Sequence, residues 1–288
     1  MSTEEALAQT LGIPYTIAQD TIGPYSINYF KAGQGRPLLL IHGANIGWGQ
    51  WYRNIPELAK RFEVWALDLP GAGRSSRVDY SKLDPQKDLV EVVEKFVRVH
   101  NLRDFHIIGA SIGGWIALQM ALRNPNLLNR VVLSNSVGFA DYMGLGDKVI
   151  GFYPLAKLIA ATILKPNRAN KRVEDFFRHT LHNRTLAIEP EFIEYFYETM
   201  SASHNLLFIS RLTQLTKRLI LIDQLSKVKN QAMVVWGEND SIMPLGRNEG
   251  SFYLIPQAEV HIVKEAGHFP SIEKAAEFNS IVANFLNT

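Results

Sequence analysis

The chain has 288 residues, enough for one large α/β domain or two smaller domains with a sizeable core. Its apolar fraction of 47% and charged fraction of 20% are typical of a globular protein and argue against a disordered or membrane-embedded chain. A net charge of +2 gives no support for nucleic-acid binding, and the absence of cysteine excludes disulfides, thiolate metal sites and a cysteine nucleophile.

The first elements along the chain are two alternating segments around Gly23-Pro24, which predict a β-hairpin at a sheet edge over residues 15–20 and 25–31. Apolar runs typical of strands buried on both faces follow at residues 37–42, 62–67, 105–108, 131–133, 232–236 and 260–263. Helical patterns separate them at about residues 52–60, 85–100, 112–123, 245–254 and 271–286. This alternation predicts a mostly parallel sheet covered by helices on both faces.

The alternation of strands and helices stops between about residues 139 and 215, where the sequence is helical throughout and rich in aromatic residues. We interpret this segment as an all-helical insertion that follows the strand at 131–133. An insertion at the carboxyl end of a parallel strand lies over the region where open α/β sheets bind ligands. The alternative is a further packing layer without a functional role.

Residues 107–114 read Ile-Ile-Gly-Ala-Ser-Ile-Gly-Gly, an apolar strand that enters Gly-x-Ser-x-Gly and then a helical pattern. This pattern is typical of a nucleophile elbow with Ser111 at its tip, where a base can reach the hydroxyl and backbone donors surround it. We expect a side chain at Gly109 or Gly113 to collide, because the strand and the following helix pass close together there.

A serine nucleophile needs a general base and an acid that fixes the tautomer of that base. His268 lies in Glu-Ala-Gly-His-Phe-Pro, between the last predicted strand and the last helix. The loop after the preceding strand reads Glu238-Asn239-Asp240-Ser241, and both of its acids are candidates. We favour Asp240 and interpret Glu238 as a solvated loop residue. The order Ser, Asp, His along the chain is the one expected after such an elbow.

From about residue 38 to the C-terminus, the chain resembles the α/β-hydrolase fold superfamily, specifically its capped branch of lipase-like and C–C-hydrolase-like enzymes. The motifs that carry the resemblance are the elbow, His42-Gly43, the segment Leu67–Ser75, Gly237-Glu-Asn-Asp240 and Gly267-His268. They stand in the order of the family.

The resemblance implies an α/β-hydrolase fold with a mostly parallel central sheet flanked by helices and a helical cap inserted after the sixth strand. The core would comprise residues 1–138 and 216–288, and the cap residues 139–215. It also implies a catalytic triad of Ser111, Asp240 and His268, and so decides for Asp240 over Glu238.

The oxyanion hole likewise follows from the resemblance, which places its donors at the backbone N–H groups of Ala44 and Ile112. His42 could be mistaken for a base, but we interpret it as a residue that shapes the loop beside this hole.

Further residues lie next to these motifs and are candidates for an apolar substrate pocket: Trp48, Phe139, Met243 and Phe269. Plain core packing is the alternative for each. Three arginines of the insertion could meet a substrate carboxylate, although a solvated helix face explains them as well: Arg178, Arg184 and Arg211. The sequence contains no spacing of histidines and carboxylates typical of a metal site, so we expect no metal and no cofactor.

These features predict a serine hydrolase that cleaves small to medium carboxylic esters through an acyl-enzyme on Ser111. One alternative is a C–C bond hydrolase of the meta-cleavage-product type, which has the same triad order and cap. Against it, Ala110 stands where those enzymes usually carry asparagine, and Phe269 where they often carry tryptophan; the loop after His42 also lacks their Gly-Pro-Gly. A ligand receptor that keeps the hydrolase fold with little turnover is a second alternative.

The expected partner is therefore a small-molecule ester. We expect no nucleic acid and no membrane span, and a homodimer is one option for the assembly. Because the acidic N-terminus does not resemble a secretory signal and no apolar segment is long enough for a membrane span, a cytoplasmic location is expected.

Overall fold

The apolar runs form an eight-stranded sheet in the order β1-β2-β4-β3-β5-β6-β7-β8 in the computed structural model, which describes residues 1–140, 151–162, 174–175, 177–199 and 202–287. β1 and β2 form the predicted hairpin, β2 runs antiparallel to β4, and β3 to β8 are parallel. The strands are β1 (Tyr15–Ile22), β2 (Tyr25–Ala32), β3 (Arg36–Ile41), β4 (Phe62–Leu67), β5 (Phe105–Ala110), β6 (Leu128–Ser134), β7 (Gln231–Gly237) and β8 (Glu259–Val263).

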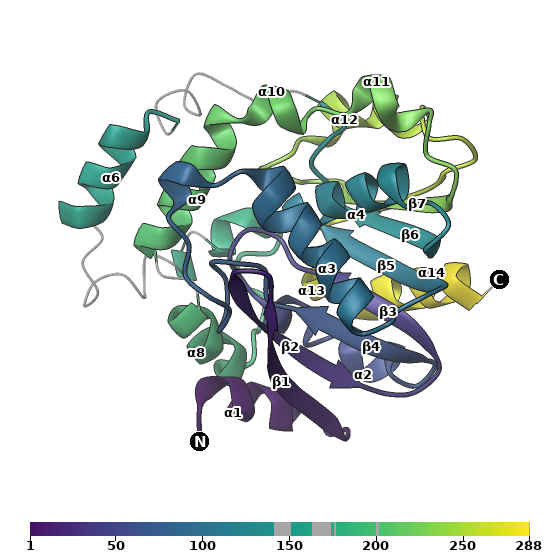
Figure 1. Ribbon diagram of the computed structural model, residues 1–288, viewed down its shortest axis with the longest axis horizontal. Helices are drawn as coiled ribbons and strands as arrows, with labels where there is room; N and C mark the ends of the chain where they lie inside the picture. Colours follow the sequence, from purple (N-terminus) through teal and green to yellow (C-terminus); the bar gives the residue numbers. More distant parts are fainter. Residues whose placement is uncertain (141–150, 163–173, 176, 200–201, 288) are drawn as a thin grey trace.

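Alternate residues of the central strands enter two different hydrophobic clusters. In β3, Leu39 and Ile41 pack into the cluster under α3 (Glu91–Val99), α4 (Ile112–Arg123) and α12 (Leu245–Phe252). Leu38 and Leu40 pack into the other, under α2 (Ile55–Leu58) and α14 (Ala275–Asn287). Figure 1 shows α3 and α4 on the near face of the sheet. Continuous apolar runs therefore encode strands that are buried on both faces.

Three of the predicted helices are interrupted or shortened. The segment at 52–60 contains only α2, preceded by a 3₁₀ turn, η1 (Trp48–Trp51). The segment at 85–100 begins as a π-helical turn, η3 (Gln86–Val90), and continues as α3. The last helix is divided into α13 (Pro270–Glu273) and α14, because the backbone of Lys274 has a non-helical φ of −127° and ψ of 46°.

An N-terminal helix, α1 (Thr3–Thr10), was not predicted from the sequence. It begins with a capping box, in which the Ser2 hydroxyl accepts from the N–H of Glu5 and the Glu5 carboxylate accepts from the N–H of Ser2. The spacing Ser-x-x-Glu is the signal that would have revealed it. α1 packs against α8 (Pro190–Thr199).

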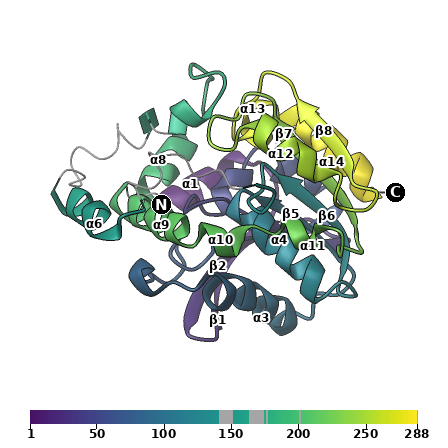
Figure 2. The same ribbon diagram turned by 90° about the horizontal axis from the view of Figure 1, so that it is seen from above.

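The predicted insertion after β6 is helical where the structure describes it, with α6 (Tyr153–Thr162), α8 and α9 (Ala202–Gln214). Residues 141–150 and 163–173 of this segment lie outside the described residues. Figures 1 and 2 both place α6, α8 and α9 on the same side of the sheet, away from the C-terminus. Two short helices, α10 (Thr216–Leu219) and α11 (Ile222–Leu225), lead back to β7, and a 3₁₀ turn, η2 (Tyr80–Lys82), follows β4.

The observed topology confirms the predicted fold: a mostly parallel sheet flanked by helices, with helices inserted after the sixth strand. Because β3 to β8 are parallel, the loops that follow β3, β5, β6, β7 and β8 all lie at one edge of the sheet. This edge is where the predicted site residues are found. Within the described parts of the chain, no helix has the length and apolarity needed to cross a membrane.

Candidate active site

Ser111 occupies the sharp turn between β5 and α4. Its φ of +54° and ψ of −118° lie outside the regions that residues with side chains ordinarily adopt. Such strain costs about 1–3 kcal/mol and persists only where the surrounding structure holds it. Here the N–H of Ser111 donates to the Ser134 carbonyl, and the Ser111 carbonyl accepts from the N–H of Val137, both at 3.0 Å. The end of β6 thus fixes the serine.

The two glycines of the elbow are required by the close approach of backbone segments. A Cβ at Gly109 would lie 2.2 Å from the carbonyl oxygen of Gly113, and a Cβ at Gly113 would lie 2.3 Å from that of Ile41. Real side chains do not tolerate such contacts with backbone atoms. A collision is therefore confirmed at both positions, but only at Gly109 is it between the elbow strand and the following helix; at Gly113 the helix meets the end of β3.

His268 and Asp240 are brought together from the loops after β8 and β7. His268 Nδ1 donates to Asp240 Oδ2 at 2.8 Å, and both side chains are buried. The other carboxylate oxygen, Oδ1, accepts from the N–H groups of Ile242 and Met243, each at 2.8 Å. Burial opposes ionisation of Asp240, but the charge on His268 and these hydrogen bonds hold its pKa below the ordinary value. Glu238 is exposed, and its carboxylate accepts from the N–H of Glu265 at 3.4 Å.

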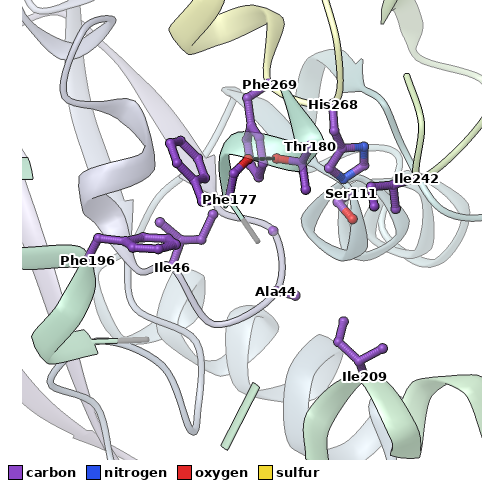
Figure 3. A pocket seen from close by; sticks show the side chains of 11 residues that line it. Ala44, Ile46, Ser111, Phe177, Thr180, Phe196, Ile209, Ile242, His268 and Phe269 are labelled. Carbon is purple, nitrogen blue, oxygen red and sulfur yellow. Dashed lines mark hydrogen bonds between the residues drawn. The ribbon is translucent and has the colours of Figure 1, made fainter. Parts of the chain in front are cut away.

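Ser111 and His268 line the same cavity, which has a volume of about 70 Å³. Figure 3 shows these two residues at one end of the cavity and Phe196 at the other. Since Nδ1 of His268 is taken by Asp240, Nε2 is the ring nitrogen left to accept a proton. Apart from Ser111, His268 and Thr180, the side chains of the described lining are apolar. The full lining consists of Gly43, Ala44, Ile46, Ser111, Phe177, Thr180, Phe196, Ile209, Ile242, His268 and Phe269.

Of the two predicted oxyanion donors, Ala44 lines this cavity, and Ile112 directly follows Ser111 in the chain. Ile112 is the first residue of α4, so its N–H is one of the helix donors without an intrahelical acceptor. The N–H of Gly43 is already used, because it donates to Gln50 Oε1 at 2.7 Å. Among the residues that the structure describes, neither the Ala44 nor the Ile112 N–H has a protein acceptor. A Cβ at Gly43 would lie 3.2 Å from Ser111 Cβ, so this loop contacts the nucleophile elbow.

His42 uses both ring nitrogens inside the protein. Nδ1 bonds to the carbonyl of Gly43, and Nε2 accepts from the N–H of Leu69 at 2.9 Å. Complete burial lowers the pKa of His42 to about 4, so the ring is neutral at neutral pH. It connects the loops after β3 and β4, which is the loop-shaping role expected for it.

Three of the four predicted pocket residues are packed in the core instead. Trp48 is fully buried, stacks on Phe30 at 4.5 Å between ring centroids and donates its indole N–H to Glu4. Phe139 is fully buried in edge-to-face contacts with Trp236 and Phe252. Met243 is also buried and contributes its backbone to the Asp240 loop. Only Phe269 of the four lines the described cavity, where its ring packs against Phe177 of the insertion at 5.3 Å between ring centroids.

Sequence reasoning missed the residues of the insertion that form the cavity wall, namely Phe177, Thr180, Phe196 and Ile209. The richness of the segment in aromatics was the available signal, but it did not separate pocket residues from core residues. Thr180 also reaches the predicted base, since its carbonyl accepts from the N–H of His268 at 2.9 Å. The insertion therefore contacts the histidine loop directly.

Glu273 on α13 strengthens this contact. Its carboxylate accepts from the N–H of Gly267 and from the N–H of His182, both at 2.7 Å. Burial raises the pKa of this carboxyl above its usual value. One side chain thus connects the loop that carries His268 to the loop of the insertion.

Two of the arginines that were candidates to bind a substrate carboxylate form polar contacts within the protein instead. Arg178 pairs with Glu174 at 2.8 Å, and Arg211 donates to the carbonyl of Leu83 at 3.0 Å. In the described part of the cavity lining, no lysine or arginine is present. Among the described residues, no three histidine or carboxylate side chains are grouped as a metal site would require.

A sheet of this topology, with a serine elbow after β5 and a His–Asp pair after β8 and β7, defines an α/β hydrolase. The family model for the alpha/beta hydrolase fold matches residues 36–275, and the chain belongs to this family.

Similar proteins include the 2-hydroxy-6-oxo-6-phenylhexa-2,4-dienoate hydrolase of Comamonas testosteroni, which is 26% identical over 94% of both chains. The 2-hydroxymuconate semialdehyde hydrolase of Pseudomonas sp. (strain CF600) is 29% identical over 90% of this chain and 89% of its own. Among solved structures, a bacterial membrane phospholipase A superposes with a TM-score of 0.80 at 24% identity, covering 99% of this chain and 91% of its own. The last likeness concerns the fold alone.

Proposed function

We propose that this protein hydrolyses a carbonyl substrate by nucleophilic catalysis, with Ser111 as nucleophile, His268 as general base and Asp240 as the residue that orients and stabilises the imidazolium. The observation that carries the proposal is the bond from His268 Nδ1 to Asp240 Oδ2, together with the shared cavity of His268 and Ser111. This arrangement leaves Nε2 to take the serine proton. The N–H groups of Ala44 and Ile112 would then stabilise the oxyanion.

The comparisons favour a C–C bond as the one that is cleaved, as in the two relatives named above. In a 6-oxo-dienoate, the serine oxygen would add to the ketone carbon while His268 takes the hydroxyl proton. Before collapse, the 2-hydroxy-diene would pass to its 2-oxo form, in which the enol proton has moved to the carbon next to the ketone. Collapse of the adduct would then break the bond between these two carbons, with the electron pair delocalised onto the 2-oxo group as a dienolate that accepts the proton from His268. Water, activated by the same histidine, then releases the acyl group as a carboxylic acid and restores Ser111.

Ester hydrolysis is the second candidate, and it has its own supporting observation. A dienoate substrate carries a carboxylate, whereas the cavity wall that the structure describes contains no lysine or arginine to pair with it. Ala110 and Phe269 also depart from the pattern of the C–C hydrolases. An uncharged ester with an apolar acyl group fits such a lining without an unpaired charge.

A parallel assay of the purified full chain separates the two candidates. Its substrates are 2-hydroxy-6-oxo-6-phenylhexa-2,4-dienoate, followed by loss of its visible absorbance, and a series of p-nitrophenyl esters of graded acyl length. A higher kcat/KM for the dienoate supports C–C cleavage, and turnover of the esters alone supports the second candidate.

Ser111→Ala should abolish both activities. Ser271→Ala is the matched control, because this buried serine has no hydrogen-bond partner for its hydroxyl among the described residues. Substantial activity of a folded Ser111→Ala protein would contradict the proposed mechanism for either substrate.

A further inference from the structure

Asn135 is a buried residue at the carboxyl end of β6 that the proposed mechanism does not use. It is only 1% exposed and adopts a left-handed backbone conformation with a φ of +43°, which asparagine tolerates better than most residues. Its backbone N–H donates to the carbonyl of Val235 on β7 at 3.0 Å. The backbone of Asn135 is therefore fixed between two strand ends beside the Asp240 loop.

The side chain of Asn135, from the end of β6, reaches the two loops that carry Asp240 and His268. Its Nδ2 donates to Asp240 Oδ2 at 2.6 Å and lies 3.5 Å from the carbonyl oxygen of Gly267, which precedes the histidine. Its Oδ1 accepts from the N–H of Gly237 at 3.4 Å. One amide group thus connects the ends of β6, β7 and β8.

The bond to Asp240 falls on the oxygen that also receives the imidazole. Oδ1 of Asp240 is held by two backbone N–H groups, while Oδ2 accepts from His268 Nδ1 and Asn135 Nδ2. Without Asn135, the imidazole would be the sole side-chain donor to Oδ2 within the described residues. The carboxylate orientation would then depend on the ring that it has to orient.

We propose that Asn135 is a positioning residue, which holds the Asp240 carboxylate in the plane and ionisation state that the His268 imidazole requires. This proposal deepens the proposed function. Its kinetic tests rest on that function, whereas its NMR test does not. Asn135 does not reach the cavity, so its effect passes through Asp240.

Asn135→Gly removes the donor while allowing the positive φ. Loss of a hydrogen bond to a charged group predicts a kcat lower by roughly 10- to 100-fold, with KM nearly unchanged, because no substrate contact is lost. Asn135→Asp keeps the shape but places two carboxyl groups at hydrogen-bond distance, where they share one proton. This variant should retain activity at acid pH and lose it at alkaline pH, as that shared proton is released.

The matched control is Asn230→Gly at the amino end of β7. Asn230 Nδ2 bonds to the backbone carbonyls of Pro125 and Leu128 at 2.9 and 2.7 Å and lies 3.5 Å from that of Asn129, at the opposite end of the sheet from Asn135. Asn230→Gly should lower Tm, whereas its kcat per folded molecule and the pH profile of that kcat should match those of the wild type.

NMR of ring-labelled histidine provides a readout that is independent of turnover. The His268 Nδ1–H resonance, assigned with His268→Gln, should be present in the wild type and broadened by exchange in Asn135→Gly. If the wild type cleaves no substrate, the proposed function fails while this signal still decides the role of Asn135. An unchanged resonance in Asn135→Gly, or a wild-type pH profile in Asn135→Asp, would overturn the proposal.

Discussion

Glu4 on α1 is a buried carboxylate that connects the N-terminal helix to the core. It is 4% exposed and accepts from Asn28 Nδ2 and Trp48 Nε1, each at 2.7 Å. It also pairs with Arg74 Nε at 3.0 Å, and Arg74 pairs in turn with Glu198 on α8. We therefore predict that Glu4→Ala destabilises the protein far more than a helix-surface change would.

The magnitude follows from the bonds that are lost. Two hydrogen bonds to a charged group contribute about 1.5–3 kcal/mol each, and the fully buried indole N–H of Trp48 would lose its acceptor. The bond to Arg74 adds little, because that side chain is 35% exposed and keeps Glu198. The expected loss is about 4 kcal/mol in the free energy of unfolding. For a chain of this size, that loss lowers Tm by roughly 10 °C.

Differential scanning fluorimetry and urea denaturation of Glu4→Ala measure this loss. Glu5→Ala is the matched control on the same helical turn, because the Glu5 carboxylate is solvent-exposed and, within the described residues, bonds only inside the capping box. Glu5→Ala should lower Tm by only a small fraction of the decrease caused by Glu4→Ala. Equal decreases in the two variants, or an unchanged Tm for Glu4→Ala, would refute the role of Glu4 in connecting α1 to the core.

Two further predictions concern the loops around the elbow. A Cβ at Gly113 would lie 2.3 Å from a backbone oxygen, so Gly113→Ala should lower both Tm and activity, whereas Gly246→Ala, with open space around it, should leave both intact in the same assays. The His42 pKa of about 4 lies below its unfolded value of about 6.5, so this ring stabilises the fold above pH 6.5 and loses that contribution as pH falls through 4. Urea denaturation at a series of pH values should show that the free energy of unfolding falls by about 3 kcal/mol over this range. This decrease should be absent in His42→Gln and present in the control His261→Gln, which changes a partly exposed histidine. The same pH dependence in all three proteins would contradict the prediction.

Local sequence patterns predicted the parts of the site that are formed by residues close together in the sequence. The elbow is encoded by glycines that allow a strand and a helix to touch, and the structure shows that contact at Gly109 and Gly113. The proximity of His268 and Asp240 followed from the parallel order of the strands together with the family resemblance. Their catalytic roles, like the domain boundaries at 138 and 216, remain predictions.

The pocket residues could not be predicted in the same way, because adjacency to a motif does not fix where a side chain lies. Trp48 lies close in sequence to the predicted oxyanion loop, yet its indole is held in the core by stacking on Phe30 and by the bond to Glu4. That bond requires α1, which periodicity did not reveal. A missed helix of eight residues thus led directly to a misplaced pocket residue.

The insertion is in direct contact with the loop that carries His268, and under the proposed function this contact would couple substrate choice to chemistry. Thr180 lines the cavity and its carbonyl also holds the N–H of His268, while Glu273 holds Gly267 and His182 together. A change in the insertion that widens the cavity would therefore move the loop that carries the base. Asn135 opposes such movement from the other side, since it fixes the Asp240 carboxylate from β6, an element that does not belong to the insertion. The part of the insertion that lines the cavity and the loop that carries His268 are thus mechanically linked, and Asn135 adds a connection from β6 to Asp240 and to Gly267 of the same loop.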